Sequence, residues 1–205
     1  DNWEGSEALR QFVSNKYVYY GNDSDEADGL CARLLSDFAD LCKGIEGKSG
    51  YSFPGGVSTF GRQLEWSGGR LACPYGRKSG EVLAANASPT PGSDREGATA
   101  IIRSYCKNPL NKLPVGAALD VKLLPSCVKG EEGLDALVSL MRGFVALGGF
   151  FMQPDVADAE ILKRAQERPE EYQNLSVRVS GWNARFVTLN REWQDMVIEQ
   201  NERSN

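Results

Sequence analysis

The stretch Leu175-Ser-Val-Arg-Val-Ser-Gly-Trp-Asn-Ala-Arg-Phe186 decides how the rest of the chain is interpreted. Its β-branched run, Val177 to Val179, is typical of a strand, and the run stops abruptly at Ser180-Gly181. A glycine at such a point is either a turn residue or a residue that serves because it has no side chain. We favour the second interpretation for Gly181.

The composition predicts one well-buried domain, or at most two small ones. The chain has 205 residues, of which 41% are hydrophobic and 25% are charged. A net charge of −5 without any basic block argues against a nucleic-acid groove. No apolar run approaches the roughly 20 residues that a membrane span needs. The sequence therefore predicts neither nucleic acid nor a membrane as a partner.

The chain contains no histidine, which removes Ser-His and Cys-His nucleophile pairs and histidine-based metal sites. None of the cysteines stands in a Cys-x-x-Cys pair, so we expect no metal in this chain. Their odd number, together with the expected lack of a secretory signal, favours reduced thiols in the cytoplasm. Chemistry here must rest on cysteine, carboxylate, backbone or a radical. The five cysteines are Cys31, Cys42, Cys73, Cys106 and Cys127.

Hydrophobic periodicity predicts helices and strands in alternation. Helices are expected over residues 3–14, 24–42, 130–148 and 158–167 and from residue 190 onward. Ser24, Asp158 and Asn190 are the expected caps. Strands are expected over 150–156 and 175–179, and short strands or apolar connectors over 101–102 and 115–124. This alternation predicts an α/β topology with too few strands to close a barrel.

Two further features of the pattern bear on function. The 24–42 helix carries an apolar stripe, and we expect the acidic residues on its other face to be solvated. The segment 44–81 is rich in glycine and irregular, which is typical of a functional or mobile loop. Its part Cys73-Pro-Tyr-Gly-Arg-Lys-Ser-Gly-Glu81 lacks the spacing of a phosphate-binding loop, so we expect no nucleotide there. The apolar stripe comprises Ala27, Leu30, Leu34, Phe38, Leu41 and Cys42.

Several segments, taken in order, resemble the glycyl radical enzyme family. The Arg178-Val-Ser-Gly-Trp182 run is similar to the family's Arg-Val-Ser/Ala-Gly-Tyr radical loop, and Pro74 to Glu81 is similar to Pro-Asp-Gly-Arg-Lys-Ser-Gly-Glu. Ser88 to Asp94 with Gly97-Ala-Thr-Ala100 resembles Ser-Pro-x-x-Gly-x-Asp and Gly-Pro-Thr-Ala. Gly21-Asn-Asp23 also resembles a family segment. So do the segments that precede the radical loop, which are Gly148 to Val156, Ala165-Gln166 and Pro169 to Tyr172. The resemblance covers nearly the whole chain and leans toward the dehydratase and lyase branch.

The resemblance implies the C-terminal part of a ten-stranded α/β barrel that a partner chain completes. Residues 1–205 would form a single glycyl-radical domain, with 1–130 contributing barrel strands and loops and 131–205 the helix, strand and radical loop. It also implies that Gly181 carries the radical, while Arg178, Val179, Ser180 and Trp182 form its loop. By the same resemblance Ser88, Pro89, Thr90 and Gln153 would lie near the substrate.

The sequence departs from the family pattern in four places. Trp182 stands where tyrosine is commoner, Tyr75 replaces an aspartate, and Pro154-Asp155 replaces Phe-Asn. The family's active-site Gly-Cys-x-Glu loop is absent from these 205 residues. We therefore expect a hetero-oligomer in which a large partner subunit supplies the thiyl cysteine.

The function expected from the resemblance is an oxygen-sensitive radical lyase in the cytoplasm or in a bacterial microcompartment. It would be a dehydratase, a C–N, C–S or C–C lyase, or a decarboxylase, and would act on a small polar substrate. The cofactor would be the glycyl radical itself, with S-adenosylmethionine and an iron–sulfur cluster only in the radical SAM activating enzyme. The alternatives are a spare part that restores a damaged glycyl radical enzyme, and a non-catalytic binding subunit.

Overall fold

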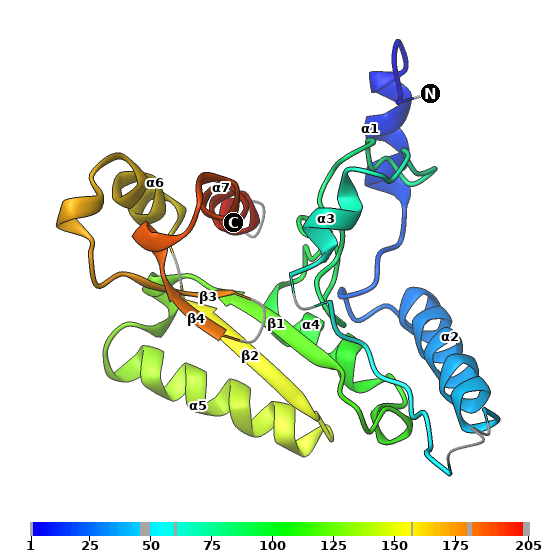
Figure 1. The fold of residues 1–205 in the computed structure, drawn as a ribbon. Coiled ribbons are helices and arrows are strands. Elements are labelled where there is room, and N and C mark those ends of the chain that lie inside the picture. Colours follow the sequence, from blue (N-terminus) through cyan, green and yellow to red (C-terminus); the bar gives the residue numbers. More distant parts are fainter. Residues whose placement is uncertain (1, 46–49, 60, 157, 180–181, 203–205) are drawn as a thin grey trace.

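The computed structural model describes residues 2–45, 50–59, 61–156, 158–179 and 182–202 (Figure 1). Within these ranges a parallel strand pair and an antiparallel hairpin are surrounded by helices. The strands are β1 (Ala118–Leu123), β2 (Phe151–Val156), β3 (Ser176–Val179) and β4 (Trp182–Arg185). The α-helices are α1 (Glu7–Lys16), α2 (Asp25–Lys43), α3 (Gln63–Ser67), α4 (Gly97–Cys106), α5 (Gly130–Ala146), α6 (Ala159–Glu167) and α7 (Arg191–Glu202). Short 3-10 helices are η1 (Leu110–Lys112), η2 (Pro125–Val128), η3 (Pro169–Glu171) and η4 (Phe186–Thr188).

The first core lies around β1, β2, α4 and α5. β1 and β2 pair in parallel from Ala118↔Phe151 to Leu123↔Val156, and α5 makes the crossover between them. Leu119 and Val121 of β1 are fully buried with Tyr105 of α4, whose ring stacks on Phe144 of α5 at 5.8 Å. This arrangement confirms the predicted α/β architecture.

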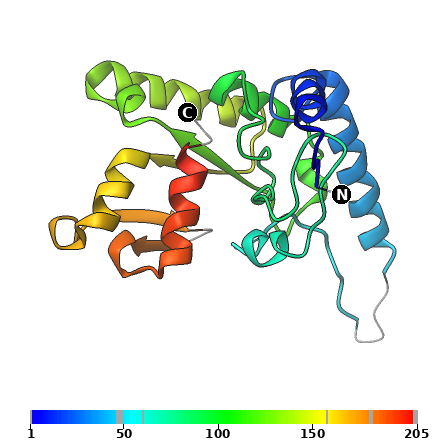
Figure 2. The ribbon, with the colours of Figure 1, turned by 90° about the horizontal axis from the view of Figure 1, so that it is seen from above.

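The second core belongs to the C-terminal segment and uses different residues. Leu162 and Ala165 of α6 pack with Val177 of β3, Phe186, and the α7 residues Met196 to Ile198. Figure 2 shows α6 and α7 on one side of the β1–β2 pair and α1 and α2 on the other. The β1–β2 pairing joins residues on both sides of the boundary predicted between residues 130 and 131, so the first core spans that boundary. The division of one domain at that point stays a prediction.

The three predicted N-cap residues directly precede their helices, and two of them cap with their side chains. Asp158 Oδ1 accepts the N–H groups of Glu160 at 2.8 Å and Ile161 at 3.4 Å, and Asn190 Oδ1 accepts the N–H of Trp193 at 3.0 Å. Ser24 is the N-cap residue of α2, as predicted, but its side chain makes no capping hydrogen bond. Its backbone carbonyl instead accepts the Asp28 N–H.

Two predictions, the conformation of residues 101–102 and the exposure of the acidic residues of α2, were wrong. Residues 101–102 belong to helix α4, because its buried residues Ala100, Ile101, Ser104 and Tyr105 recur at helical spacing against the core and outweigh the β-propensity of isoleucine. Asp28 on the acidic face of α2 is fully buried. The expected apolar stripe of α2 lies mostly at the surface, with Leu30, Leu34 and Leu41 exposed by 62%, 69% and 73%.

No helix among the described residues combines the length and the apolar character that crossing a membrane requires.

Candidate functional site: the polar face of the parallel strands

One face of the β1–β2 pair is polar, because side chains alternate along each strand. Leu119 and Val121 enter the core, so Asp120 and Lys122 lie on the opposite face. In the parallel register Asp120 stands beside Gln153, and Lys122 stands beside Asp155. Lys122 Nζ forms an ion pair with Asp155 Oδ2 that is largely shielded from solvent. The face therefore carries two carboxylates, one ammonium and one amide, in two pairs that are two residues apart along the strands.

The hairpin that carries the predicted radical loop borders this face. A cavity of about 460 Å³ is lined by the β2 residues 151–155 together with Ser176, Val177 and Asn183 of the hairpin. Gln153, which was predicted to lie near substrate, is half-buried in that wall. Polar groups from β2 and from the hairpin therefore meet in a single cavity.

The hairpin itself is held at its base. β3 and β4 pair antiparallel from Ser176↔Arg185 to Val179↔Trp182, so only Ser180 and Gly181 stand between the strands in sequence. Both residues lie outside the described part of the chain, as do the side chains of Arg178, Val179 and Trp182. Val177 is buried in the second core. The loop residues keep their predicted roles as predictions.

The other three residues predicted near substrate lie in three different surroundings. Ser88 lies on the open edge of β1, where its Oγ accepts the Asp120 N–H at 2.8 Å. Pro89 is buried against Gly21. Thr90 borders a separate cavity of about 220 Å³, which Arg10, Tyr19 and Tyr75 also line. Ser88 and Gln153 thus flank Asp120 from opposite edges of β1, whereas Thr90 faces another cavity.

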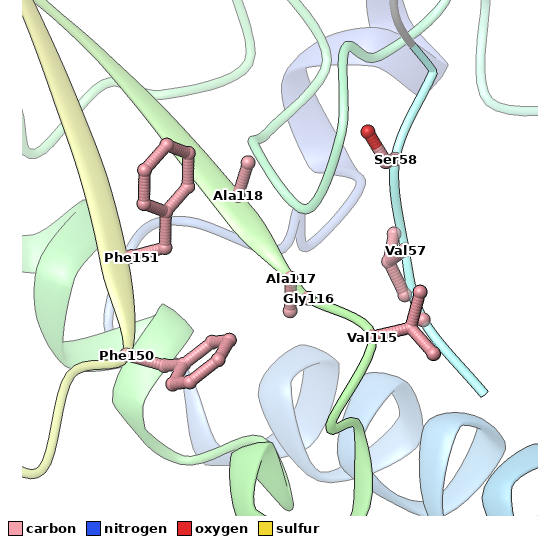
Figure 3. Close-up of a pocket in the computed structure, with 9 residues that line it drawn as sticks. Val57, Ser58, Val115, Gly116, Ala117, Ala118, Phe150 and Phe151 are labelled. Carbon is pink, nitrogen blue, oxygen red and sulfur yellow. The ribbon is translucent and has the colours of Figure 1, made fainter. Parts of the chain in front are cut away.

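An apolar cavity of about 530 Å³ lies at the beginning of β1 and β2 (Figure 3). Phe150 and Phe151 form one side, Val57 and Val115 form the other, and Ser58 supplies a hydroxyl group at the rim. Val57 also forms an isolated parallel bridge with Ala117, which extends the sheet beyond β1. Apolar walls with a single polar group suit packing more than polar chemistry.

Burial raises the pKa of several ionisable side chains. It raises the pKa of Asp94, although backbone N–H groups at Gly92 and Asp94 oppose the shift. Burial also raises the pKa of Tyr20, whose hydroxyl donates to Ala87 O at 3.1 Å. The thiols of Cys31 and Cys106 have a raised pKa for the same reason, so they are protonated at neutral pH.

All five cysteines lie in the described ranges, and none forms a disulfide there. Across the described residues, no group of three or more His, Cys, Asp or Glu side chains is arranged to hold a metal ion.

Sequence reasoning missed Asn86, Asp120 and the Lys122–Asp155 pair. The signal for the strand residues was present, because Ala118-Leu-Asp-Val-Lys-Leu123 alternates polar and apolar side chains as a half-buried strand does. Asn86 carried no such signal. Its importance depends on contacts with residues 27 and 34 positions away.

Comparison with known proteins identifies the fold. The "Glycine radical" family model matches residues 83–187, and the "Pyruvate formate lyase-like" model matches residues 1–65. Trans-4-hydroxy-L-proline dehydratase of Clostridioides difficile is 32% identical over 99% of this chain and 26% of its own length.

Solved structures give the same result. The B12-independent glycerol dehydratase of Clostridium butyricum superposes with a TM-score of 0.89 at 33% identity, over 97% of this chain and 25% of its own. A glycyl radical enzyme from Archaeoglobus fulgidus gives a TM-score of 0.88 at 36% identity, over 97% and 26% of the two chains. The chain spans about a quarter of the length of these relatives, and its fold is a portion of their α/β barrel. It belongs to the glycyl radical enzyme family, in the group that includes dehydratases and other lyases.

Proposed function

We propose that Gly181 stores a glycyl radical and that this chain is the radical-bearing part of a lyase acting on a small polar substrate. The observation that carries the proposal is the family-model match over residues 83–187, which includes Gly181. The site geometry supports it, because the strands flanking Ser180-Gly181 line the same 460 Å³ cavity as Gln153 and Asp155.

Glycine suits this role for a physical reason. An α-carbon radical between an amide nitrogen and a carbonyl is delocalised in both directions, which requires the carbon to become planar. A side chain would oppose that flattening, and glycine also tolerates backbone angles closed to other residues. An activating enzyme that holds S-adenosylmethionine and an iron–sulfur cluster would remove one hydrogen atom from Gly181 Cα. An oxygen-sensitive radical of this kind suits the cytoplasm or a bacterial microcompartment.

We further propose that the attacking cysteine belongs to a complementary region, supplied by a large partner subunit. Two helices support this part, because each has an apolar surface beyond the one it packs into the core. Leu30, Leu34 and Leu41 of α2 are exposed, and so are Leu134 and Val145 of α5. Exposed large apolar side chains on two helices favour an interface there.

The radical is tested by anaerobic electron paramagnetic resonance. We would combine this chain, the complementary subunit, S-adenosylmethionine and the activating enzyme, and compare Gly181→Ala with Gly29→Ala. Gly29 lies within α2, and a Cβ there would meet no atom within 4 Å, so its variant controls for glycine replacement in general. We expect a glycine-type doublet in the wild type and in Gly29→Ala, and none in Gly181→Ala. An activating enzyme that is active on another substrate but yields no doublet here would refute the radical role.

The partner and the substrate are tested separately. A subunit should co-purify in fixed stoichiometry with a chain that carries Gly-Cys-x-Glu, whereas a spare part should bind a complete enzyme weakly. A single larger polypeptide in the native protein would remove the separate subunit while leaving the radical proposal intact. Trans-4-hydroxy-L-proline and glycerol, named by the relatives above, begin the substrate panel.

A further inference from the structure

Asn86 joins three segments of the chain at the edge of the polar face. Its Oδ1 accepts the Thr59 N–H at 2.9 Å and the Ser58 Oγ–H at 3.3 Å. Its Nδ2 donates to Asp120 Oδ2 at 2.7 Å. Its φ of 53° lies in the left-handed region, which asparagine tolerates better than most residues.

Residues 57–59 and residues 86–88 follow one after the other along the edge of β1 that faces away from β2. Val57 pairs with Ala117 at the start of this edge. Ala87 N–H donates to Ala118 O at 2.8 Å one residue further along, and Ser88 Oγ then accepts the Asp120 N–H. Asn86 stands where the first segment ends and the second begins. Two segments of the chain therefore cover this edge of β1, and the hydrogen bonds of Asn86 link them.

The carboxylate that Asn86 contacts lies on the polar face of the β1–β2 pair, beside the β2 wall of the 460 Å³ cavity. Asp120 stands beside Gln153 in the register, and the Lys122–Asp155 ion pair lies two residues further along on the same face. Of the three ionisable side chains named on this face, Asp120 and Asp155 are acidic and Lys122 is basic. This face therefore favours a substrate group that donates hydrogen bonds, a hydroxyl or an ammonium, over an anionic one.

We propose that Asn86 is a positioning residue of the substrate pocket. It fixes the Asp120 carboxylate and the Ser58–Thr59 segment relative to Gln153, so that Asp120 accepts a hydrogen bond from a hydroxyl or ammonium group of the substrate. This inference rests on the proposed function, since it assumes that the polar face binds the substrate of the radical reaction.

The first test is Asn86→Gly in the assembled enzyme, with Asn174→Gly, at an exposed turn position, as the matched control. Glycine keeps the left-handed backbone and removes only the side chain. Loss of a hydrogen bond to a charged group corresponds to an effect of about tenfold or more. We expect KM for the substrate that is turned over to rise by about that factor, while the doublet and kcat stay within about twofold of wild type.

The second test separates positioning from a purely structural role. Asn86→Asp places a second carboxylate beside Asp120 and should lower Tm and raise KM further. Adding Asp120→Asn restores one amide donor facing one carboxylate, with the two sides exchanged. We expect the exchanged pair to recover Tm but not KM, because the carboxylate has left position 120.

The outcomes of the two tests are distinct from a failure of the proposed function. Recovery of KM together with Tm in the exchanged pair, or an unchanged KM in Asn86→Gly, would overturn the inference. A wild-type enzyme without a doublet would instead overturn the proposed function, on which the inference rests.

Discussion

Gly21 and Asn22 hold the loop formed by residues 88–95 in place. Gly21 has a φ of 102°, and a Cβ built on it would lie 2.3 Å from Pro89 Cγ. Its neighbour Asn22 donates to Ser93 O at 2.7 Å and accepts the Arg95 N–H at 2.7 Å. The Gly-Asn turn thereby fixes a loop some 70 residues away.

We expect Gly21→Ala to lower the free energy of unfolding by about 2–4 kcal/mol, because a strained backbone and a steric clash act together. Denaturant titration measures the change. Gly116→Ala is the matched control, since Gly116 has a φ of 128° but no atom within 4 Å of a built Cβ. Equal losses in the two variants would mean that contact with Pro89 contributes nothing.

At the scale of elements, α2 and α4 are joined by a charged cluster. Lys107, directly after α4, contacts Asp23, Asp25 and Asp28 at 2.8 to 2.9 Å. Asp28 is fully buried and also accepts the Ser104 hydroxyl at 2.9 Å. Hydrogen bonds from Lys107 and then Arg103 lower the pKa of Asp23. The acidic start of α2 therefore serves as an anchor to α4.

We expect Lys107→Met to destabilise the chain by about 2–3 kcal/mol, because it leaves the buried Asp28 carboxylate without its cation. This loss of stability is smaller than for a fully buried ion pair, because the Lys107 side chain is itself 32% exposed. Adding Asp28→Asn removes the stranded charge and should recover part of the loss. Thermal unfolding of the two variants measures this, and additive losses would argue that the two groups do not interact.

At the scale of the whole molecule, the described residues form two separate cores and leave several apolar side chains exposed. The first core and the second core share no buried residue, and β1 and β2 pair only with each other among the named strands. The exposed row Leu30, Leu34 and Leu41 follows one side of α2. Such surfaces promote self-association in the isolated chain.

We expect the isolated chain to self-associate at micromolar concentration, as light scattering would reveal. Leu30→Gln, Leu34→Gln and Leu41→Gln combined should reduce that association and weaken binding of the complementary region. Their effect on the unfolding free energy should stay within about 1 kcal/mol, since these side chains are already exposed. Leu71→Gln, at an isolated side chain exposed by 81%, is the control. A monodisperse wild-type monomer at high concentration would contradict the expectation.

Features that depend on near neighbours follow from the amino-acid sequence alone. The alternation along strands and the caps at Asp158 and Asn190 are local patterns. The short motifs that lead to Gly181 are local as well, and the family follows from the order in which they occur along the sequence. These were predictable because each rests on backbone geometry within a few residues.

Which side chains meet across long separations depends on the tertiary structure. It made residues 101–102 helical, buried Asp28 beneath Lys107, and placed Ser88 and Thr90 in different surroundings. It also brought Asn86 to both Thr59 and Asp120. Burial and pairing at such distances depend on how whole elements pack, and one residue's chemical type does not specify which distant partner it will find.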